Sequence, residues 1–465
     1  MRADRVHSLC AILFSSLSFV HPALGIDLTI DDEQSVKDAS SEAIWGAMTF
    51  YHGNESGQIP GAFPEKWWEG SALLLAALNY WHFTGDDTYN EDVSVGLQWQ
   101  GGDHGDYMPS NYSSYLGNDD QMFWGLSALT AAEYGFPDRK EGFSWLSLAQ
   151  GTFNTMKARW DNESCGGGMR WQLFVYQGSG YTLKNAISNG GFFQLAARLA
   201  MYTQKSEYAD WARKTWEWCL TTPMINNKTW TINDSTQGSN NCADTDHMQW
   251  SYNYGVFLAG AAYMYTFYTY PKKTNDSYWL EVVHGILGSI FKIFFPKGIM
   301  YDPDCEIAQN CNNNEVLFKG EVVTWMALTA LMIPDLYDEI MPKLKNSAVG
   351  AAASCSGLGN NSCGVRWYQS KFDGHHSMEA EISSSCVLSV NMLPFVDRDK
   401  KKPLNIHKGG NSKSDPNAGN LKDNDDAAAA ALSPITTGDK AGAAILTVAF
   451  IGGWLGLAAF MFIGA

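Results

Sequence analysis

The chain has 465 residues, enough for one large domain or several smaller ones. Its 32 Lys and Arg stand against 49 Asp and Glu, and the formal net charge of −17 repels phosphate backbones, which excludes nucleic acid as a partner. Hydrophobic residues make up 45% of the chain and aromatic residues 13%, which excludes global disorder. So many flat rings either fill a rich core or stack on the neutral rings of a carbohydrate.

The first 25 residues have the pattern of a secretory signal peptide. Arg2 and Arg5 precede an apolar run over 9–20, and the small residues Ala23 and Gly25 stand at −3 and −1 of a cut after Gly25. We therefore expect the mature chain to begin at Ile26 and to lie outside the cell.

The C-terminal residues resemble a GPI-attachment signal. Residues 441–465 carry no charge, and the Lys or Arg residues that normally follow a single-pass anchor are missing. Upstream, Asp426-Ala427-Ala428 and a spacer to Lys440 predict attachment at Asp426 and removal of 427–465, with Asn424 and Asn417 as alternative sites. A plain C-terminal anchor is the competing interpretation.

Two mature regions follow from this pattern. Residues 400–426 are polar and rich in Gly, Asn, Asp and Lys, which predicts a flexible tether behind a domain over 26–399. A GPI lipid would hold the protein at the extracellular face of the plasma membrane and in the cell wall.

Cysteine usage agrees with an extracellular location. Eight of the nine Cys remain after loss of Cys10, and an even number in a secreted chain predicts disulfides. Cys305 with Cys311 and Cys355 with Cys363 are close enough to pair, while the full connectivity stays open. No Cys-x-x-Cys occurs, and we expect no metal and no cofactor. Glycosylation is permitted at seven sequons: Asn54, Asn111, Asn162, Asn227, Asn233, Asn275 and Asn360.

Apolar periodicity predicts helices along the whole chain and almost no strands. The expected helices cover residues 32–51, 67–83, 87–100, 119–134, 141–158, 189–203, 206–220, 252–268, 276–294, 319–333, 335–352 and 377–392. Every second one opens on Gly or a polar residue and is then almost wholly apolar, which indicates burial on all sides. The others are amphipathic. A repeat of one outer and one inner helix predicts an all-α fold, an (α/α)6 barrel of six helical hairpins.

The connections predict where function lies. The chain turns quickly after each inner helix, whereas about 15 to 30 residues precede each inner helix, a length typical of functional loops. All long loops therefore fall at the N-terminal ends of the inner helices, where exposed amide dipoles also gather.

Asp119 and Asp120 are the candidate catalytic residues at that end. We expect Asn118 to cap the second inner helix and to place both acids in its first turn. Acids at this position can simply favour the helix dipole, which contributes about 0.3 to 1 kcal/mol. Two carboxylates about 5 Å apart, the spacing of retaining glycosidases, repel by about 3 kcal/mol at an effective dielectric constant near 20. One group then stays ionised as a nucleophile while the other keeps its proton as a general acid.

Four motifs at the starts of inner helices resemble glycoside hydrolase family 76, in particular its fungal, GPI-anchored members. They are Gly-Asn-Asp-Asp-Gln at 117–121, Lys-Asn-Ala-Ile-Ser-Asn-Gly at 184–190, Trp-Ser-Tyr-Asn-Tyr-Gly at 250–255 and Phe-Lys-Gly at 318–320. The resemblance covers about residues 27–395 and implies an (α/α)6 fold, a retaining mechanism, Asp119 as nucleophile and Asp120 as acid/base. Tyr254 stands where many family members have Gln, which puts details of the sugar subsites in doubt.

Other residues are candidates for sugar binding, each with a structural alternative. Trp124, Trp171 and Tyr252 can stack on mannose rings or belong to the core. Asn189 and Asn253 can hydrogen-bond sugar hydroxyls or cap helices, and Asn185 is a weaker candidate of the same kind.

Further polar groups are explained by structural roles. Asp103-His104-Gly105-Asp106 can bind a sugar or a metal but fits a solvated loop better, Glu69 fits a helix cap, and His375-His376 lack metal-ligand spacing. Phosphate-binding loops, Gly-x-Ser-x-Gly and His-Glu-x-x-His do not occur.

The expected function is a retaining α-1,6-mannosidase-type glycosidase or transglycosylase. Its donor would be mannan or the mannose core of a GPI glycan, and its acceptor water or a wall glucan, in fungal cell-wall biogenesis. Two alternatives are a non-catalytic, lectin-like mannan-binding protein and a purely structural anchor protein. Paired carboxylates argue against the first and long loops on one face against the second.

Overall fold

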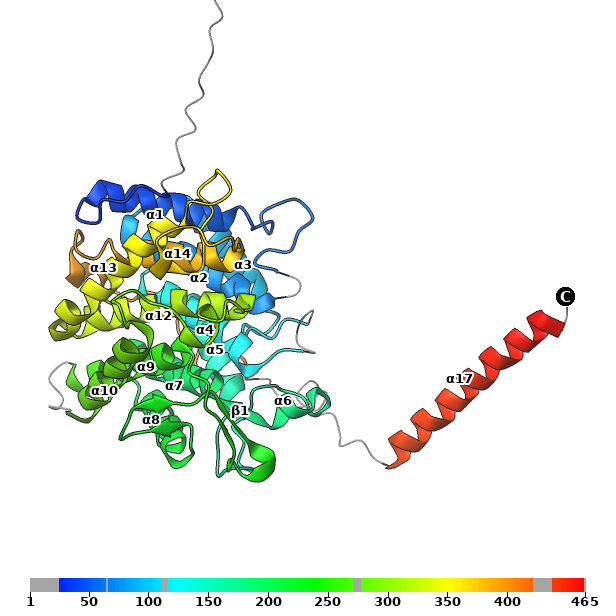
Figure 1. Cartoon of the computed structure of the whole chain (residues 1–465). Helices are drawn as coiled ribbons and strands as arrows, with labels where there is room; N and C mark the ends of the chain where they lie inside the picture. The colour runs from blue at the N-terminus through cyan, green and yellow to red at the C-terminus, as the bar shows by residue number, and fades with distance from the viewer. Residues whose placement is uncertain are drawn as a thin grey trace, which may run out of the picture.

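A computed structural model describes residues 25–63, 66–110, 112, 115–270, 277–420 and 437–463 (Figure 1). Within these residues, twelve long helices form the barrel. The inner helices are α2 (Trp67–Thr84), α4 (Asn118–Glu133), α7 (Ala186–Thr203), α9 (Ser251–Thr269), α12 (Asn313–Met332) and α14 (Met378–Val390). The outer helices are α1 (Glu33–Met48), α3 (Asn90–Gln100), α5 (Trp145–Ala158), α8 (Ser206–Thr221), α10 (Ser277–Phe294) and α13 (Tyr337–Ser354).

The inner helices form a closed ring. Each packs on its neighbour in chain order, and α14 packs on α2 to complete the circle. The outer helices cover this ring, for example α8 on α7 and α10 on α9. The predicted (α/α)6 barrel is therefore confirmed, with helix ends shifted by a few residues.

Glycines near the starts of the inner helices let neighbouring helices approach closely. A Cβ atom on Gly190 would lie 2.5 Å from Val256, and one on Gly255 would lie 2.7 Å from Trp325. A Cβ on Gly320 would lie 2.8 Å from the backbone of Ser383. The glycines that mark these helices in the sequence thus have a packing role, because a side chain there would push the ring apart.

The remaining regular elements are short. A three-stranded sheet contains β1 (Leu183–Asn185), β4 (Ser235–Gln237) and β5 (Thr245–Asp246), and a second pair contains β2 (Ile225–Asn226) and β3 (Thr231–Ile232). The short helices are α6 (Ser179–Thr182), α11 (Pro303–Glu306) and α15 (Arg398–Lys401), with 3₁₀ turns at Val175–Gln177, Gly238–Asn240, Pro334–Leu336 and Trp367–Gln369. In β1, Asn185 pairs with Ser235 of β4, which brings the loop before α9 to the start of α7.

Three disulfides lie in the long loops. Cys305–Cys311 and Cys355–Cys363 form as expected, and Cys165–Cys242 joins the loops that precede α7 and α9. The expectation that all eight cysteines are paired is wrong for Cys219 and Cys386, which are free and buried in the core. Buried thiols of this kind behave as small apolar side chains.

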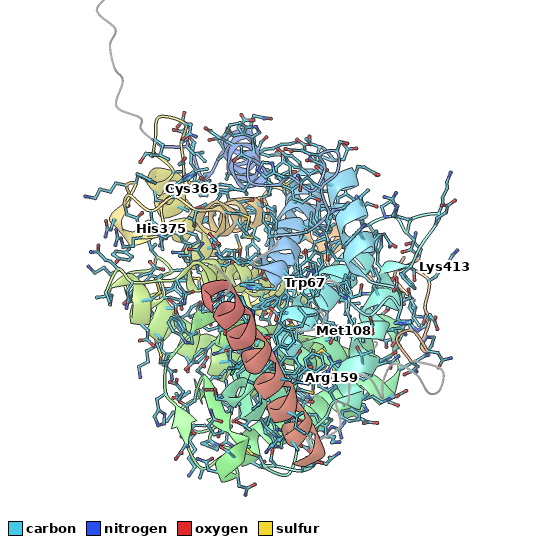
Figure 2. The ribbon with its side chains drawn as sticks, turned by 90° about the vertical axis from the view of Figure 1, so that its right-hand side faces the viewer. Trp67, Met108, Arg159, Cys363, His375 and Lys413 are labelled. Carbon is cyan, nitrogen blue, oxygen red and sulfur yellow. A yellow bond between two sulfur atoms is a disulfide. The ribbon has the colours of Figure 1, made fainter. Side chains whose placement is uncertain are left out.

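The expected flexible tether is an ordered strap over 403–420, which we call the C-terminal strap. Its first residues bond to carbonyl groups at the C-terminal ends of α4 and α7. Leu404 N–H donates to the Glu133 carbonyl at 2.8 Å, and Ile406 N–H donates to the Tyr202 carbonyl at 3.0 Å. Farther on, Asn154 of α5 donates to the carbonyls of Pro416 and Ala418. Lys413 marks the strap in Figure 2. The domain therefore extends beyond residue 399.

The expected targeting segments lie mostly outside the described residues. These include residues 1–24 of the signal peptide and 421–436, with the proposed attachment sites Asn424 and Asp426. Residues 437–463 form one long helix, α17 (Thr437–Ile463). No helix within the described part of the chain meets the length and hydropathy that a membrane span requires.

Candidate active site

A cavity of about 450 Å³ opens at the N-terminal ends of the inner helices and contains both predicted catalytic residues. We call it the active-site cavity. Its walls come from the starts of α2, α4, α9 and α12 and from the loops that precede α7 and α9. Its polar lining residues are Lys66, Asp119, Asp120, Gln172, Asn185, Asp234, Asn312, Asn314 and Glu315. Long loops and helix N-termini thus meet at the end of the barrel where the sequence places them.

The start of α4 is fixed from outside the helix. Gly117 is its N-cap and Asn118 its first residue, so Asn118 is not the cap that the sequence predicts. Asn118 donates to the Arg170 carbonyl at 2.8 Å and accepts from Arg159 Nε at 2.9 Å. These bonds hold the following two aspartates rigidly at the cavity.

The two aspartates have different hydrogen bonds. Asp120 Oδ2 accepts a 2.7 Å bond from Gly117 N–H, whereas Asp119 Oδ1 accepts from Asp120 N–H at 3.1 Å. Asp119 Oδ2 also faces Asn185 Nδ2 at 3.4 Å. Asp120 therefore has the shorter bond from the helix N-terminus, which stabilises its ionised form.

Burial raises the pKa of both carboxyl groups. The pKa of Asp120 is about 6, because the bond from Gly117 offsets part of the desolvation. The pKa of Asp119 rises well above its usual value, through burial and then through the charge of Asp120. The pair thus holds one proton near neutral pH, shared between the two carboxyl groups.

A third carboxyl group, Asp234, lies in the same cavity and was missed by the sequence analysis. Asn253 Nδ2 donates to Asp234 Oδ1 at 3.0 Å, and burial raises the pKa of Asp234 to about 6. The Asp234 carbonyl accepts from Ala186 N–H at 2.7 Å, which ties its loop to the start of α7. Asp234 belongs to a loop without periodicity, so no local signal in the sequence marks it.

Aromatic side chains form the apolar walls. Trp171 and Tyr252 line the cavity as predicted, and Tyr252 stacks on Phe318 with ring centroids 3.7 Å apart. On the opposite wall, Trp68 packs on Phe123 at 4.8 Å. Flat faces next to carboxyl and amide groups suit a ligand with apolar ring faces and polar edges, as sugars have.

Trp124 does not line the active-site cavity, and its predicted contact with a sugar is wrong. Its side chain is fully buried between Trp67 and Tyr107, with ring centroids 5.3 and 5.5 Å away. Trp124 stands four positions after Asp120 in α4, but its ring packs in the core and does not reach the cavity. This residue belongs to the core, which was its structural alternative.

The predicted asparagines divide in a similar way. Asn189 is fully buried; its side chain donates to the carbonyls of Met169 and Asn185 and accepts from Met169 N–H, so it holds a loop and does not reach the cavity. Asn253 is also fully buried and acts through Asp234. Asn185, the weaker candidate, does line the cavity.

The remaining polar candidates lie outside the active-site cavity. Asp106 is buried and accepts from Met108 N–H, as a loop-stabilising acid does. Glu69 is buried beside Lys66 at 3.5 Å, and Lys66 also contacts Glu379 at 2.9 Å. Burial and the neighbouring Glu379 raise the pKa of Glu69 to about 8. Lys66, the partner of both glutamates, lines the active-site cavity, whereas Asp106 and Glu69 do not.

Two lysines of the sequence motifs have equivalent structural roles. Lys184 contacts Asp161 at 2.8 Å and donates to the carbonyls of Ser164 and Gly167. Lys319 contacts Glu306 at 2.8 Å and donates to the Val365 carbonyl. Each buried ammonium group therefore secures the long loops around the start of an inner helix.

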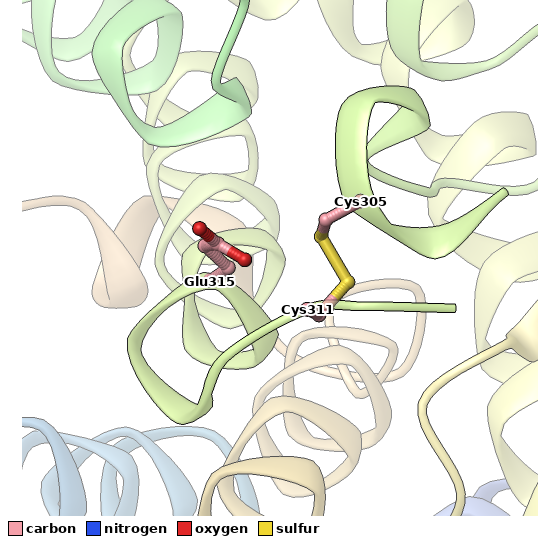
Figure 3. A group of neighbouring side chains, drawn as sticks. All are labelled: Cys305, Cys311 and Glu315. Atoms are coloured by element: carbon pink, nitrogen blue, oxygen red, sulfur yellow. A yellow bond between two sulfur atoms is a disulfide. The ribbon is translucent and has the colours of Figure 1, made fainter. Parts of the chain in front are cut away.

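Cys305, Cys311 and Glu315 form a compact group at the edge of the cavity (Figure 3). The carboxylate and sulfur atoms lie within 4.8 Å of one another, but the two sulfurs are bonded to each other. A disulfide has no thiolate to offer a metal. Glu315 instead completes a capping box with Asn312 at the start of α12.

Comparison with known proteins places this chain in one family. Residues 35–404 match the model of glycosyl hydrolase family 76. The chain is 39% identical over 454 residues to mannan endo-1,6-alpha-mannosidase DCW1 of Saccharomyces cerevisiae, covering 96% of each chain. It is 36% identical over 455 residues to mannan endo-1,6-alpha-mannosidase DFG5 of Candida albicans, covering 96% of this chain and 97% of the relative.

Solved structures share the fold. Dfg5 from Chaetomium thermophilum, solved in complex with glucosamine, has 35% identity and a TM-score of 0.80 over 86% of this chain and 99% of its own. An inactive variant of the alpha-1,6-mannanase of Salegentibacter sp. HEL1_6, solved with alpha-1,6-mannotetrose, has 16% identity and a TM-score of 0.61 over 78% and 99% of the two chains.

Proposed function

The chain belongs to glycosyl hydrolase family 76, and we propose that it is a retaining α-1,6-mannosidase-type enzyme of the fungal cell wall. The observation that carries this proposal is the pair Asp119 and Asp120. Both lie in the first turn of an inner helix, at a cavity with aromatic walls, and burial raises both pKa values. Two carboxyl groups that share one proton supply the nucleophile and the general acid that retaining glycoside cleavage requires.

In the proposed reaction, Asp119 attacks the anomeric carbon while Asp120 donates its proton to the departing glycosidic oxygen. The bond to the leaving sugar breaks as the ester bond to Asp119 forms. Asp120 then removes a proton from the acceptor, whose oxygen displaces Asp119 and restores the carboxylate. These roles follow the family pattern at positions 119 and 120.

The shared proton must be on Asp120 when the leaving oxygen departs. Burial raises the pKa of both carboxyl groups, so that one of them keeps a proton near neutral pH. Positive charge develops at the anomeric carbon in the transition state and favours ionised Asp119, which leaves the proton on Asp120.

Two classes of acceptor use the same intermediate. Water gives hydrolysis, and a hydroxyl of a wall glucan gives transglycosylation. A well-held acceptor can compete with water because its effective molarity far exceeds that of a solute in free solution. We propose transfer to wall glucan as the physiological outcome, in keeping with a protein held at the wall.

The names of the relatives and the terminal sequence patterns support the proposed donor and location. Relatives of 36–39% identity are named mannan endo-1,6-alpha-mannosidases, which supports mannan or the mannose core of a GPI glycan as donor. The glucosamine bound by the Chaetomium protein supports a sugar-binding cavity. We further propose that a GPI lipid anchors the mature chain at the extracellular face of the plasma membrane.

A lectin-like protein is the alternative function, and the site gives it little support. Neutral sugars are bound by amides, hydroxyls and aromatic faces. Two neighbouring carboxyl groups with raised pKa values contribute repulsion to such a site without a matching gain in binding.

Isotope-labelled products test the proposal. The mature chain over 26–426 is incubated with α-1,6-mannotetraose and a β-1,3-glucan oligosaccharide in ¹⁸O-water, with Asp119→Asn and Asp120→Asn as controls. Labelled shorter mannosides indicate hydrolysis, and unlabelled mannose–glucan hybrids indicate transfer. If the wild-type protein gives neither product but binds the donor as well as both variants do, the lectin function replaces this proposal.

A further inference from the structure

A second cavity, of about 230 Å³, lies among long loops that precede two other inner helices. Its lining comes from residues 306–311, which precede α12, and residues 365–375, which precede α14. We call it the polar cavity. His375, which lies on its wall, is labelled in Figure 2. Because both loops precede inner helices, the polar cavity belongs to the functional end of the barrel.

The Cys305–Cys311 disulfide forms the partition between the two cavities. Cys311 lines the polar cavity, while the next residue, Asn312, lines the active-site cavity. The Glu315 carboxylate of the active-site cavity lies within 4.8 Å of the disulfide sulfurs (Figure 3). Trp250 and Phe318, also of the active-site cavity, pack against Cys305. The two cavities therefore lie on either side of the junction between Cys311 and Asn312.

Buried polar atoms in the wall of the polar cavity lack partners. Glu306 is 2% exposed, and its Oε1 accepts from Lys319 Nζ at 2.8 Å and from Asp302 N–H at 3.0 Å. Its Oε2 atom has no hydrogen-bond partner among the described residues, and neither has His375 Nε2. Because an unsatisfied buried polar group is unfavourable, hydrogen bonds from the hydroxyl groups of a ligand would be favourable here.

The charges of the polar cavity are paired within its walls. Arg366 Nε contacts Asp373 Oδ2 at 3.0 Å, and Glu306 contacts Lys319 at 2.8 Å. A phosphate or a free cation would lie close to positive and negative side chains alike, so this surface favours neither kind of ion. A neutral ligand with many hydroxyl groups fits this surface, and the volume is half that of the active-site cavity.

Gln309 is held at the polar cavity in a strained conformation. Its φ of +58° lies in the left-handed region, which is unfavourable for a non-glycine residue. Gln309 N–H donates to the Glu306 carbonyl at 3.3 Å, and the neighbouring Asn310 N–H donates to the Cys305 carbonyl at 3.2 Å. The turn thus presents an amide side chain, a common sugar ligand, at the mouth of the polar cavity.

We propose that the polar cavity is an accessory subsite for one neutral hexose unit of a glycan chain that also occupies the active-site cavity. This inference rests on the proposed function, because it assumes a carbohydrate in the active-site cavity. The hexose belongs either to the mannan donor or to the glucan acceptor, and both offer the same ring of hydroxyl groups. Glu306 Oε2, His375 Nε2 and the Gln309 amide would bind these hydroxyls.

Calorimetric titration tests the subsite without turnover. The mature chain with Asp119→Asn is titrated with α-1,6-mannotetraose and, separately, with the β-1,3-glucan tetrasaccharide laminaritetraose. Gln309→Gly removes the amide and relieves the strained φ, so this variant is expected to fold at least as well as the parent. His375→Ala is the second variant. Ile307→Ala is the matched control, because Ile307 is 64% exposed on the same loop and does not line the polar cavity.

We expect the Kd for one of the two saccharides to rise about five- to tenfold in both variants and to stay unchanged in the control. The saccharide affected identifies the chain that enters the polar cavity. Unchanged Kd values for both saccharides would mean that the cavity holds only water and would overturn the subsite. Failure of the parent to bind either saccharide would overturn it as well. A parent that binds normally while the wild-type enzyme forms no product would contradict the proposed function alone.

Discussion

The side-chain amide of Asn253 donates a hydrogen bond of 3.0 Å to the carboxyl group of Asp234, which lines the active-site cavity. Asn253 is buried and cannot reach the ligand, so it acts by positioning Asp234 and by stabilising its ionised form. Asn253, which belongs to the 250–255 motif at the start of α9, thus acts through Asp234, a loop residue outside the four motifs.

Asp234→Asn is expected to raise KM about tenfold or more, because charge-assisted hydrogen bonds to a substrate contribute about 1.5–3 kcal/mol. Asn253→Ala should have a smaller effect at high pH and shift the pH dependence of KM upward, since the pKa of Asp234 rises further without its donor. Steady-state kinetics between pH 5 and 8 measure both effects. An unchanged KM in Asp234→Asn would remove Asp234 from the binding site.

Two tryptophans should respond differently to truncation. Trp171→Ala removes a wall of the active-site cavity and is expected to weaken sugar binding about tenfold, with little loss of stability. Trp124→Ala removes a fully buried ring and is expected to lower the free energy of unfolding by about 3–5 kcal/mol. Calorimetric titration and denaturant unfolding of both variants separate these effects. The assignment is wrong if the two variants exchange behaviour.

The protein should be more stable at acidic than at alkaline pH. Burial raises the pKa of Glu321 to about 8, of Asp302 to about 7 and of Glu381 to about 7. Since these groups lose their protons near pH 4 in the unfolded chain, the native state binds more protons between about pH 4 and 8. The free energy of unfolding therefore decreases as the pH rises through this range.

Thermal unfolding at pH 5 and pH 8 measures this decrease as a lower Tm at pH 8. Glu321→Gln lies away from the active-site cavity and should reduce the difference, by raising the Tm at pH 8 more than at pH 5. A Tm that increases from pH 5 to pH 8 would contradict the raised pKa values.

The C-terminal strap should contribute to stability. Removal of residues 403–465 deletes the hydrogen bonds to Glu133, Tyr202 and Asn154 and exposes the surface that buries Asn405. At about 0.5–1.5 kcal/mol per bond, we expect the free energy of unfolding to fall by roughly 3 kcal/mol or more. Removal of residues 427–465 alone is the matched control and should leave stability unchanged. Equal stability of the two truncated chains would mean that the strap contributes nothing.

The ring of helices was predictable because burial on every side leaves a strong mark on sequence. The close approaches at Gly190, Gly255 and Gly320 require residues without a side chain, and the periodicity then places each helix within a few residues. The active-site end of the barrel followed from loop lengths, and Asp119 and Asp120 reached the cavity because helix N-termini gather there.

The orientation of single side chains was not predictable. Trp124 and Asn189 stand near helix starts, yet a rotation of about 100° per residue decides whether a side chain faces the cavity, a neighbouring helix or a loop. Asp234 was missed because its position depends on the pairing of β1 with β4, which has no local signal. The polar composition of the strap predicts a tether, whereas its backbone N–H and carbonyl groups bond to the barrel, a use that composition does not reveal.

Isolation of the covalent intermediate tests the central claim most directly. An activated, slowly hydrolysed fluorinated α-mannosyl fluoride is incubated with the wild-type mature chain, and the digested protein is analysed by tandem mass spectrometry. We predict one mannosyl ester, located on Asp119, and no ester in Asp119→Asn, while Asp120→Ala still forms the ester from this activated donor. An ester on Asp120 would reverse the two roles, and the absence of any ester from an enzyme that turns over the donor would contradict the retaining mechanism.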